Sequence, residues 1–116
     1  MNDQQGDYTE QMFRRLIGKD LWVLCATDLG RHLYIHPVKL ENHTCTFCCV
    51  SWAMHNKYPE DVSLSSMAMY YQLHISRFEV ITPVQVYTTE EIIEPICAAQ
   101  GMPLDEALDY LKGYGL

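Results

Sequence analysis

The chain has 116 residues, a length that predicts one compact domain spanning residues 1–116. Apolar residues make up 48% of the sequence and charged residues 20%, which excludes the disordered, collagen-like and low-complexity classes. Eight Lys and Arg residues stand against fifteen Asp and Glu residues, and this net charge of −7 argues against direct binding to nucleic acid or to an anionic membrane surface.

The first predicted elements are a helix and a buried strand. Asp7 and Glu10 have the spacing of a capping box, and apolar residues then recur at helical intervals until Gly18 offers a C-terminal stop. The segment 21–26 is a continuous apolar run that is typical of a central strand.

The next part of the sequence predicts a hairpin. Residues 31–40 alternate between polar and apolar types and should pair with the strand before them. Glu41 and Asn42 then form a plausible two-residue reversal that leads into a third strand over residues 43–50. With this reversal, positions whose numbers sum to 83 lie opposite each other.

The middle of the chain is less regular. Residues 52–63 are polar and contain a proline, so we expect a loop or a single helical turn there. Residues 67–76 alternate with the period of a half-buried strand, which residues 78–81 would extend, and Pro83 should limit the ladder because it donates no backbone hydrogen bond.

The last third of the sequence predicts two helices. Thr88 and Glu91 form a second capping box, Pro95 should kink or interrupt the helix that follows, and Gly101 should end it. The core stripe of the last helix is Leu104, Ala107, Leu108 and Leu111. Strands followed by helices predict an α+β fold, with a small, mainly antiparallel sheet of about four to five strands, an N-terminal helix and two C-terminal helices.

Several large side chains are expected in the core of this fold. Trp22 and Trp52 are the two tryptophans, and Met67, Met69 and Tyr71 share one face of the expected fourth strand. Tyr58 and Tyr70 are instead expected to be exposed near the polar loop, where tyrosine offers large contact area at low entropic cost.

One stretch of the sequence is dense in residues that can bind metal. Cys45 and Cys48 have the spacing of half a zinc knuckle, and the predicted hairpin would bring His36 within diagonal reach of Cys45 or Cys49. The seven candidate ligands are His32, His36, His43, Cys45, Cys48, Cys49 and His55. The competing interpretation is that these cysteines are buried and act as small apolar residues, and it leads us to expect no metal and no cofactor.

The same residues could serve a cysteine nucleophile with a histidine base. A reactive thiol needs an electropositive, partly exposed setting, whereas these cysteines lie in apolar strands with few cations nearby. Phosphate-binding loops and the common metalloprotease and hydrolase motifs are absent from the sequence. We therefore expect no catalytic residues and a protein that is not an enzyme. A zinc-binding protein or a small enzyme using His36, His43, Cys45 and Cys49 is the alternative.

Negative charge is concentrated at the end of the chain. Residues 88–116 carry six acidic residues against Lys112 alone: Glu90, Glu91, Glu94, Asp105, Glu106 and Asp109. Carboxylates in the first turn of a helix are stabilised by the helix dipole, which accounts for those at the two helix starts without any function. The functional interpretation is an acidic helical face that meets a basic partner.

These observations lead to one preferred hypothesis. The protein is a non-enzymatic interaction module that binds a larger basic protein through the six acidic residues together with Tyr58 and Tyr70. One specific version is an inhibitor from a phage or mobile element that competes with nucleic acid for a basic groove on a host defence nuclease. No apolar run approaches the roughly 20 residues that cross a bilayer, and no export signal is present, so we expect a cytoplasmic protein without membrane contact.

Overall fold

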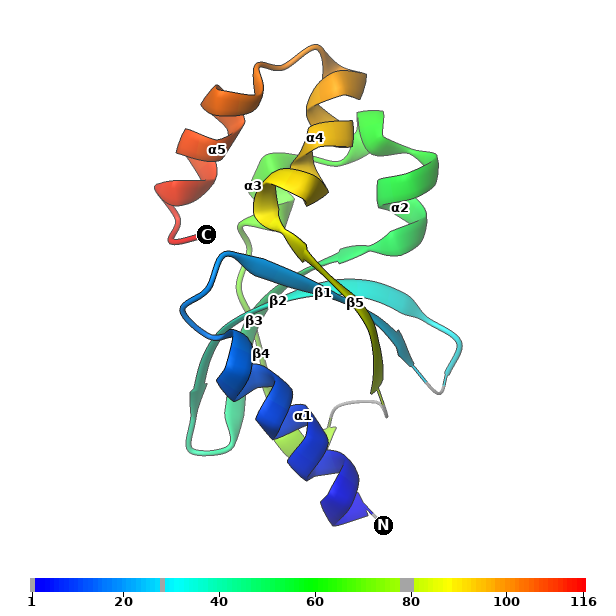
Figure 1. The fold of residues 1–116 in the computed structure, drawn as a ribbon, viewed down its shortest axis with the longest axis vertical. Coiled ribbons are helices and arrows are strands. Elements are labelled where there is room, and N and C mark those ends of the chain that lie inside the picture. The colour runs from blue at the N-terminus through cyan, green and yellow to red at the C-terminus, as the bar shows by residue number, and fades with distance from the viewer. Residues whose placement is uncertain (1, 28, 78–80) are drawn as a thin grey trace.

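The computed structural model describes residues 2–27, 29–77 and 81–116, with side chains described for residues 9–26, 29–77 and 83–116. It has the expected α+β fold, in which one five-stranded antiparallel sheet lies between helices (Figure 1). The strands are β1 (Leu21–Thr27), β2 (His32–Glu41), β3 (Thr44–Ser51), β4 (Tyr71–His74) and β5 (Ile81–Thr88). The helices are α1 (Asn2–Leu16), α2 (Trp52–Lys57), α3 (Leu64–Met67), α4 (Thr89–Gln100) and α5 (Leu104–Lys112), with short 3-10 turns η1 (Pro59–Asp61) and η2 (Ile75–Arg77).

The N-terminal helix α1 is longer than expected. It begins at Asn2, so Asp7 lies inside the helix and is not its N-cap, contrary to the capping-box prediction. Glu10 instead accepts a hydrogen bond from the Arg14 guanidinium at 2.8 Å, one helical turn further along. Beyond the helix, Gly18 has a φ of +81°, a left-handed conformation that glycine adopts without strain.

The sheet has the strand order β4-β3-β2-β1-β5, so β4 and β5 are its edges. Pro83 lies within β5 opposite Cys25, at the point where the pairing with β1 shifts by one residue. The ladder therefore continues through Pro83 and does not stop there, because a proline on an edge strand next to a bulge leaves no partner unpaired.

The β2–β3 hairpin corrects the predicted register. Its turn is centred on Asn42 and His43, which both have positive φ as a type I′ turn requires, so Glu41 pairs with Thr44. A further irregularity between Pro37 and Lys39 shifts the pairing again. The rule that paired positions sum to 83 is therefore wrong.

The segment after β3 is more ordered than the sequence indicated. Ser51 caps α2, its hydroxyl accepting a hydrogen bond from the backbone N–H of Met54 at 3.4 Å, and η1 follows. The strand expected over residues 67–76 is reduced to β4, because its first residues close helix α3. The extension expected over residues 78–80 lies outside the described residues, and Ile81 belongs to β5 instead.

The two faces of the sheet each carry a core. Helix α1 covers one face, where Phe13 packs with Val23, Cys25, Ile35 and Cys45. The other four helices cover the opposite face, where the largest buried side chains are Trp22, Met67, Ile92, Ile93, Ile96 and Leu111. Trp22 and Met67 are buried as predicted, but Trp52, Met69 and Tyr71 are exposed because α2, the α3–β4 link and the edge strand carry them outward.

The C-terminal helices are placed by local signals and one long-range bond. The capping box is formed by Thr88 and Glu91, and Gly101 ends α4 in the left-handed conformation. Of the kink or interruption predicted at Pro95, the interruption is absent, because α4 runs through Pro95 as a single element. The Trp22 indole N–H donates to the Thr89 hydroxyl at 2.9 Å and ties α4 to β1. Among the described residues, no helix has the length and apolar character needed to cross a bilayer.

Candidate protein-interaction surface

The acidic residues of α4 lie opposite its buried stripe. Ile92, Ile93 and Ile96 are buried against the sheet, which leaves Glu90 and Glu94 on the exposed side. Glu91 is also exposed, but its carboxylate accepts hydrogen bonds from the backbone N–H of Thr88 at 2.9 Å and from the Thr88 hydroxyl at 3.1 Å. The Glu91 carboxylate therefore already has a structural use in the capping box.

Helix α5 repeats this arrangement. Ala107 and Leu111 are its buried residues, and Asp105, Glu106 and Asp109 are exposed. The Asp105 carboxylate accepts a hydrogen bond from the backbone N–H of Glu106 at 3.0 Å, within the first turn of the helix.

Two like-charge pairs are formed on these helices. Glu90 and Glu94 are four residues apart on α4, and Asp105 and Asp109 are four residues apart on α5. Carboxylates at this spacing face each other and destabilise a helix by about 0.2–0.5 kcal/mol per pair. No described ion pair includes any of the six carboxylates, and the basic residue nearest to them in the sequence is Lys112, three residues after Asp109.

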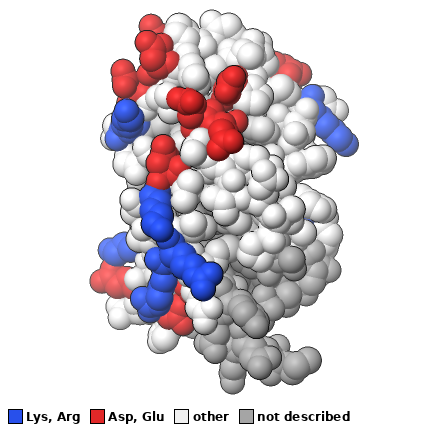
Figure 2. Space-filling model, in the orientation of Figure 1, with Lys and Arg blue, Asp and Glu red and all other residues white. Residues whose placement is uncertain are grey.

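The carboxylates gather on one part of the surface. In Figure 2 most of the red groups lie in the upper part of the view, over α4 and α5, and the largest group of Lys and Arg lies below, toward the end of α1 and the β2–β3 hairpin; smaller basic groups flank the acidic ones at the upper left and upper right. The helix dipole favours acidic residues in the first turns of α4 and α5, but it does not account for Glu94 and Asp109, which lie further along.

Exposed tyrosines border this acidic surface. The Tyr70 hydroxyl donates a hydrogen bond to the backbone carbonyl of Tyr114, and the rings of Tyr110 and Tyr114 lie 5.1 Å apart. These three tyrosines, the tyrosine cluster, are each 40–50% exposed. A hydrogen bond with the Tyr114 hydroxyl raises the pKa of Tyr110. Of these three tyrosines, only Tyr70 was predicted as part of the binding surface. The four-residue spacing of Tyr110 and Tyr114 was a signal that could have indicated the others.

Tyr58 is exposed as well, but it belongs to a different place. It caps the C-terminal end of α2, and α2 and α5 lie on opposite sides of α4 in Figure 1. The structure therefore groups Tyr70 with Tyr110 and Tyr114, and separates Tyr58 from them.

The seven candidate metal ligands are dispersed. His36 pairs with Cys48, not with Phe47, so Cys45 and Cys49 lie with Ile35 on the α1 side of the sheet and His36 faces the other side. The remaining histidines are also apart. His32 is exposed at the start of β2, and His43 is exposed in the turn after β2. His55 is buried on α2, and its Nε2–H donates to the carbonyl of Ile92 at 2.6 Å. Within the described ranges, no three His, Cys, Asp or Glu residues are placed to hold a metal ion.

The thiols are also poorly suited to nucleophilic chemistry. Burial raises the pKa of Cys25 and Cys48 to about 12 and the pKa of Cys45 to about 11, and it raises the pKa of Cys49 and Cys97 as well. A thiolate is the reactive form, and these shifts make it scarce at neutral pH. Four of the five cysteines are buried, and Cys49 is partly buried, so they are better described as small apolar residues.

Comparisons with known proteins add no functional assignment: no family model, curated protein or solved structure matches this chain.

Proposed function

We propose that this protein is a non-enzymatic interaction module that binds a basic protein through the acidic surface of α4 and α5 and the adjoining tyrosine cluster. The observation that carries the proposal is the four-residue spacing of two exposed like-charge pairs, Glu90 with Glu94 and Asp105 with Asp109, none of which takes part in a described ion pair. Such pairs cost folding stability, and Lys or Arg residues of a partner would turn that cost into attraction.

The tyrosine cluster supports the same proposal from different chemistry. Charged residues at the rim of an interface mainly raise the rate of association, whereas aromatic residues supply much of the binding energy at protein interfaces. Tyr70, Tyr110 and Tyr114 offer half-exposed rings beside the acidic helices. Together they provide an aromatic centre with an acidic flank, which suits a basic protein surface.

A specific form of the proposal is an inhibitor in the cytoplasm, encoded by a phage or mobile element, that competes with nucleic acid for a basic groove on a host defence nuclease. The acidic surface would occupy a groove built for phosphates while repelling nucleic acid itself. Competition is measured with the purified partner and labelled double-stranded DNA. Increasing amounts of the protein should displace the DNA from the groove.

The decisive experiment changes one residue of each like-charge pair. A Glu94→Gln/Asp109→Asn variant relieves the repulsion, so its free energy of unfolding should be unchanged or higher by about 0.2–0.5 kcal/mol per pair. Its retention of basic proteins from a lysate of the source cells should nevertheless fall, as measured by affinity capture and mass spectrometry at low and moderate salt. Stability and binding thus move in opposite directions.

The matched control removes the same number of charges elsewhere. A Glu60→Gln/Asp61→Asn variant neutralises two exposed carboxylates of η1, outside α4 and α5. It should retain the same basic proteins as the unmodified chain. If both variants lose them equally, net charge alone explains the retention; if neither loses them, the acidic surface is not the binding site. Either result refutes the proposal.

A further inference from the structure

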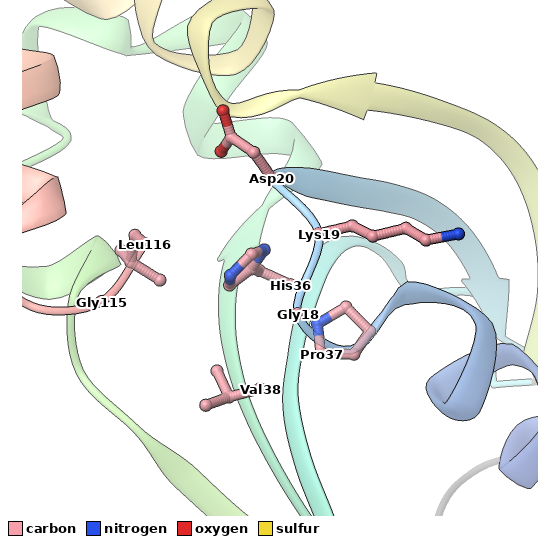
Figure 3. Close-up of a pocket in the computed structure, with 8 residues that line it drawn as sticks. All are labelled: Gly18, Lys19, Asp20, His36, Pro37, Val38, Gly115 and Leu116. Carbon is pink, nitrogen blue, oxygen red and sulfur yellow. The ribbon is translucent and has the colours of Figure 1, made fainter.

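A pocket of about 260 Å³ opens where three distant segments meet (Figure 3). The turn between α1 and β1 supplies Lys19 and Asp20, and the middle of β2 supplies His36, Pro37 and Val38. The segment after α5 supplies Leu116. The pocket is slightly smaller than the pockets that hold drug-sized ligands.

The hydrogen bond of the His36 ring determines which of its two nitrogens carries the hydrogen and which can accept one. Its Nδ1 lies 2.7 Å from the carbonyl oxygen of Leu21, and a carbonyl can only accept, so Nδ1 carries the hydrogen. In the neutral ring Nε2 then bears a lone pair. Burial lowers the pKa of His36 below its ordinary value of 6.5, which favours this neutral form.

The His36 ring is held in place, yet Nε2 is available. The residue is 4% exposed, and its ring stacks on Trp22 at 5.1 Å between ring centres. No described residue forms a hydrogen bond with Nε2. His36 is one of the residues that line the pocket.

The other lining groups define the chemistry of a ligand. Asp20 is an exposed residue at the rim of the pocket, close enough that its charge raises the pKa of His36 against the larger effect of burial. The Lys19 ammonium points away from His36 in Figure 3, and no described ion pair joins it to Asp20. Val38 and Leu116 add apolar walls. The side chains thus offer two acceptors, one of them charged, beside an apolar surface.

We propose that this pocket binds an alkylammonium group, whose N–H donates to Nε2 of His36, whose charge lies beside Asp20 and whose carbon chain packs against Val38 and Leu116. The group could come from a free small amine or from a lysine side chain of another protein. The proposal uses residues outside α4 and outside the exposed face of α5, so it stands or falls independently of the function proposed above.

The test follows the His36 ring by long-range ¹H–¹⁵N NMR while n-butylammonium chloride is added at constant ionic strength. The spectrum without ligand should show hydrogen on Nδ1 and none on Nε2. The Nε2 signal should then move to saturation with a Kd on the order of 1 mM, as expected for so small a ligand. 1-Butanol, which lacks the charge, and butyrate, which reverses it, should produce no saturable shift.

Variants and a second ligand complete the experiment. Asp20→Asn should weaken butylammonium binding about two- to fivefold, as expected for one partly exposed ion pair, and the matched Glu60→Gln should leave it unchanged. A capped glycyl-lysyl-glycine peptide distinguishes the sources: binding of both ligands indicates a lysine side chain, and binding of butylammonium alone indicates a free amine. Hydrogen on Nε2 in the free protein, equal binding of 1-butanol, or no shift at about 50 mM butylammonium would overturn the proposal.

Discussion

The hydrogen bond between Trp22 and Thr89 is the point at which the position of α4 can be tested most directly. Both residues are at most 1% exposed, and the bond joins β1 to the first residue of the acidic helix. Thr89→Val keeps the shape and the β-branch but removes the acceptor, so the indole N–H is left buried and unpaired. An unpaired buried donor costs about 1–3 kcal/mol, and we expect the free energy of unfolding to fall by that amount.

The loss is measured by urea denaturation followed by far-ultraviolet circular dichroism. With a slope of about 1.5 kcal/mol/M, a loss of 1.5 kcal/mol lowers the midpoint by about 1 M without changing the slope. A double-mutant cycle gives the control, because Trp22→Phe removes the donor itself. In that background Thr89→Val should cost little. An equal loss in both backgrounds would show that the hydrogen bond does not hold α4, and would refute the reasoning.

Three further predictions follow from described residues. Burial lowers the pKa of His36 below 6.5, so as the pH falls the imidazole is protonated in the unfolded chain before it is protonated in the folded one. The free energy of unfolding should therefore fall by up to about 1.4 kcal/mol per pH unit below about pH 6.5. The same pH slope in His36→Gln would contradict this. Cys25 and Cys48, with pKa values near 12, should react with iodoacetamide at neutral pH more slowly than free cysteine, and intact-mass measurements showing full native labelling would contradict this. Gly101 has a φ of +66°, so Gly101→Ala should cost about 1 kcal/mol in thermal or urea unfolding and Gly101→Asn less; equal losses would argue against left-handed strain as the cause.

Part of the candidate site was predictable because it depends on short-range signals. The capping box at Thr88 and the stop at Gly101 fix the limits of α4, and the periodicity of its isoleucines fixes which side is exposed. These signals act within a few residues, so the sequence places the α4 and α5 carboxylates on the outer side of their helices without knowledge of the rest of the fold. The sequence did not predict that Tyr70 would contact Tyr114, because that contact joins residues 44 positions apart.

By itself, then, the sequence determined the α+β class, the order of most elements and the exposure of the acidic residues, since capping, glycine stops and periodicity act locally. Only the tertiary structure decided the environment of His36. A type I′ turn at Asn42 and His43 and the irregularity after Pro37 changed the hairpin register, and a one-residue change moves a strand's side chains to the opposite face of the sheet. For that reason His36 does not lie near Cys45 and Cys49 but faces Leu21, Trp22 and the pocket that Leu116 also lines.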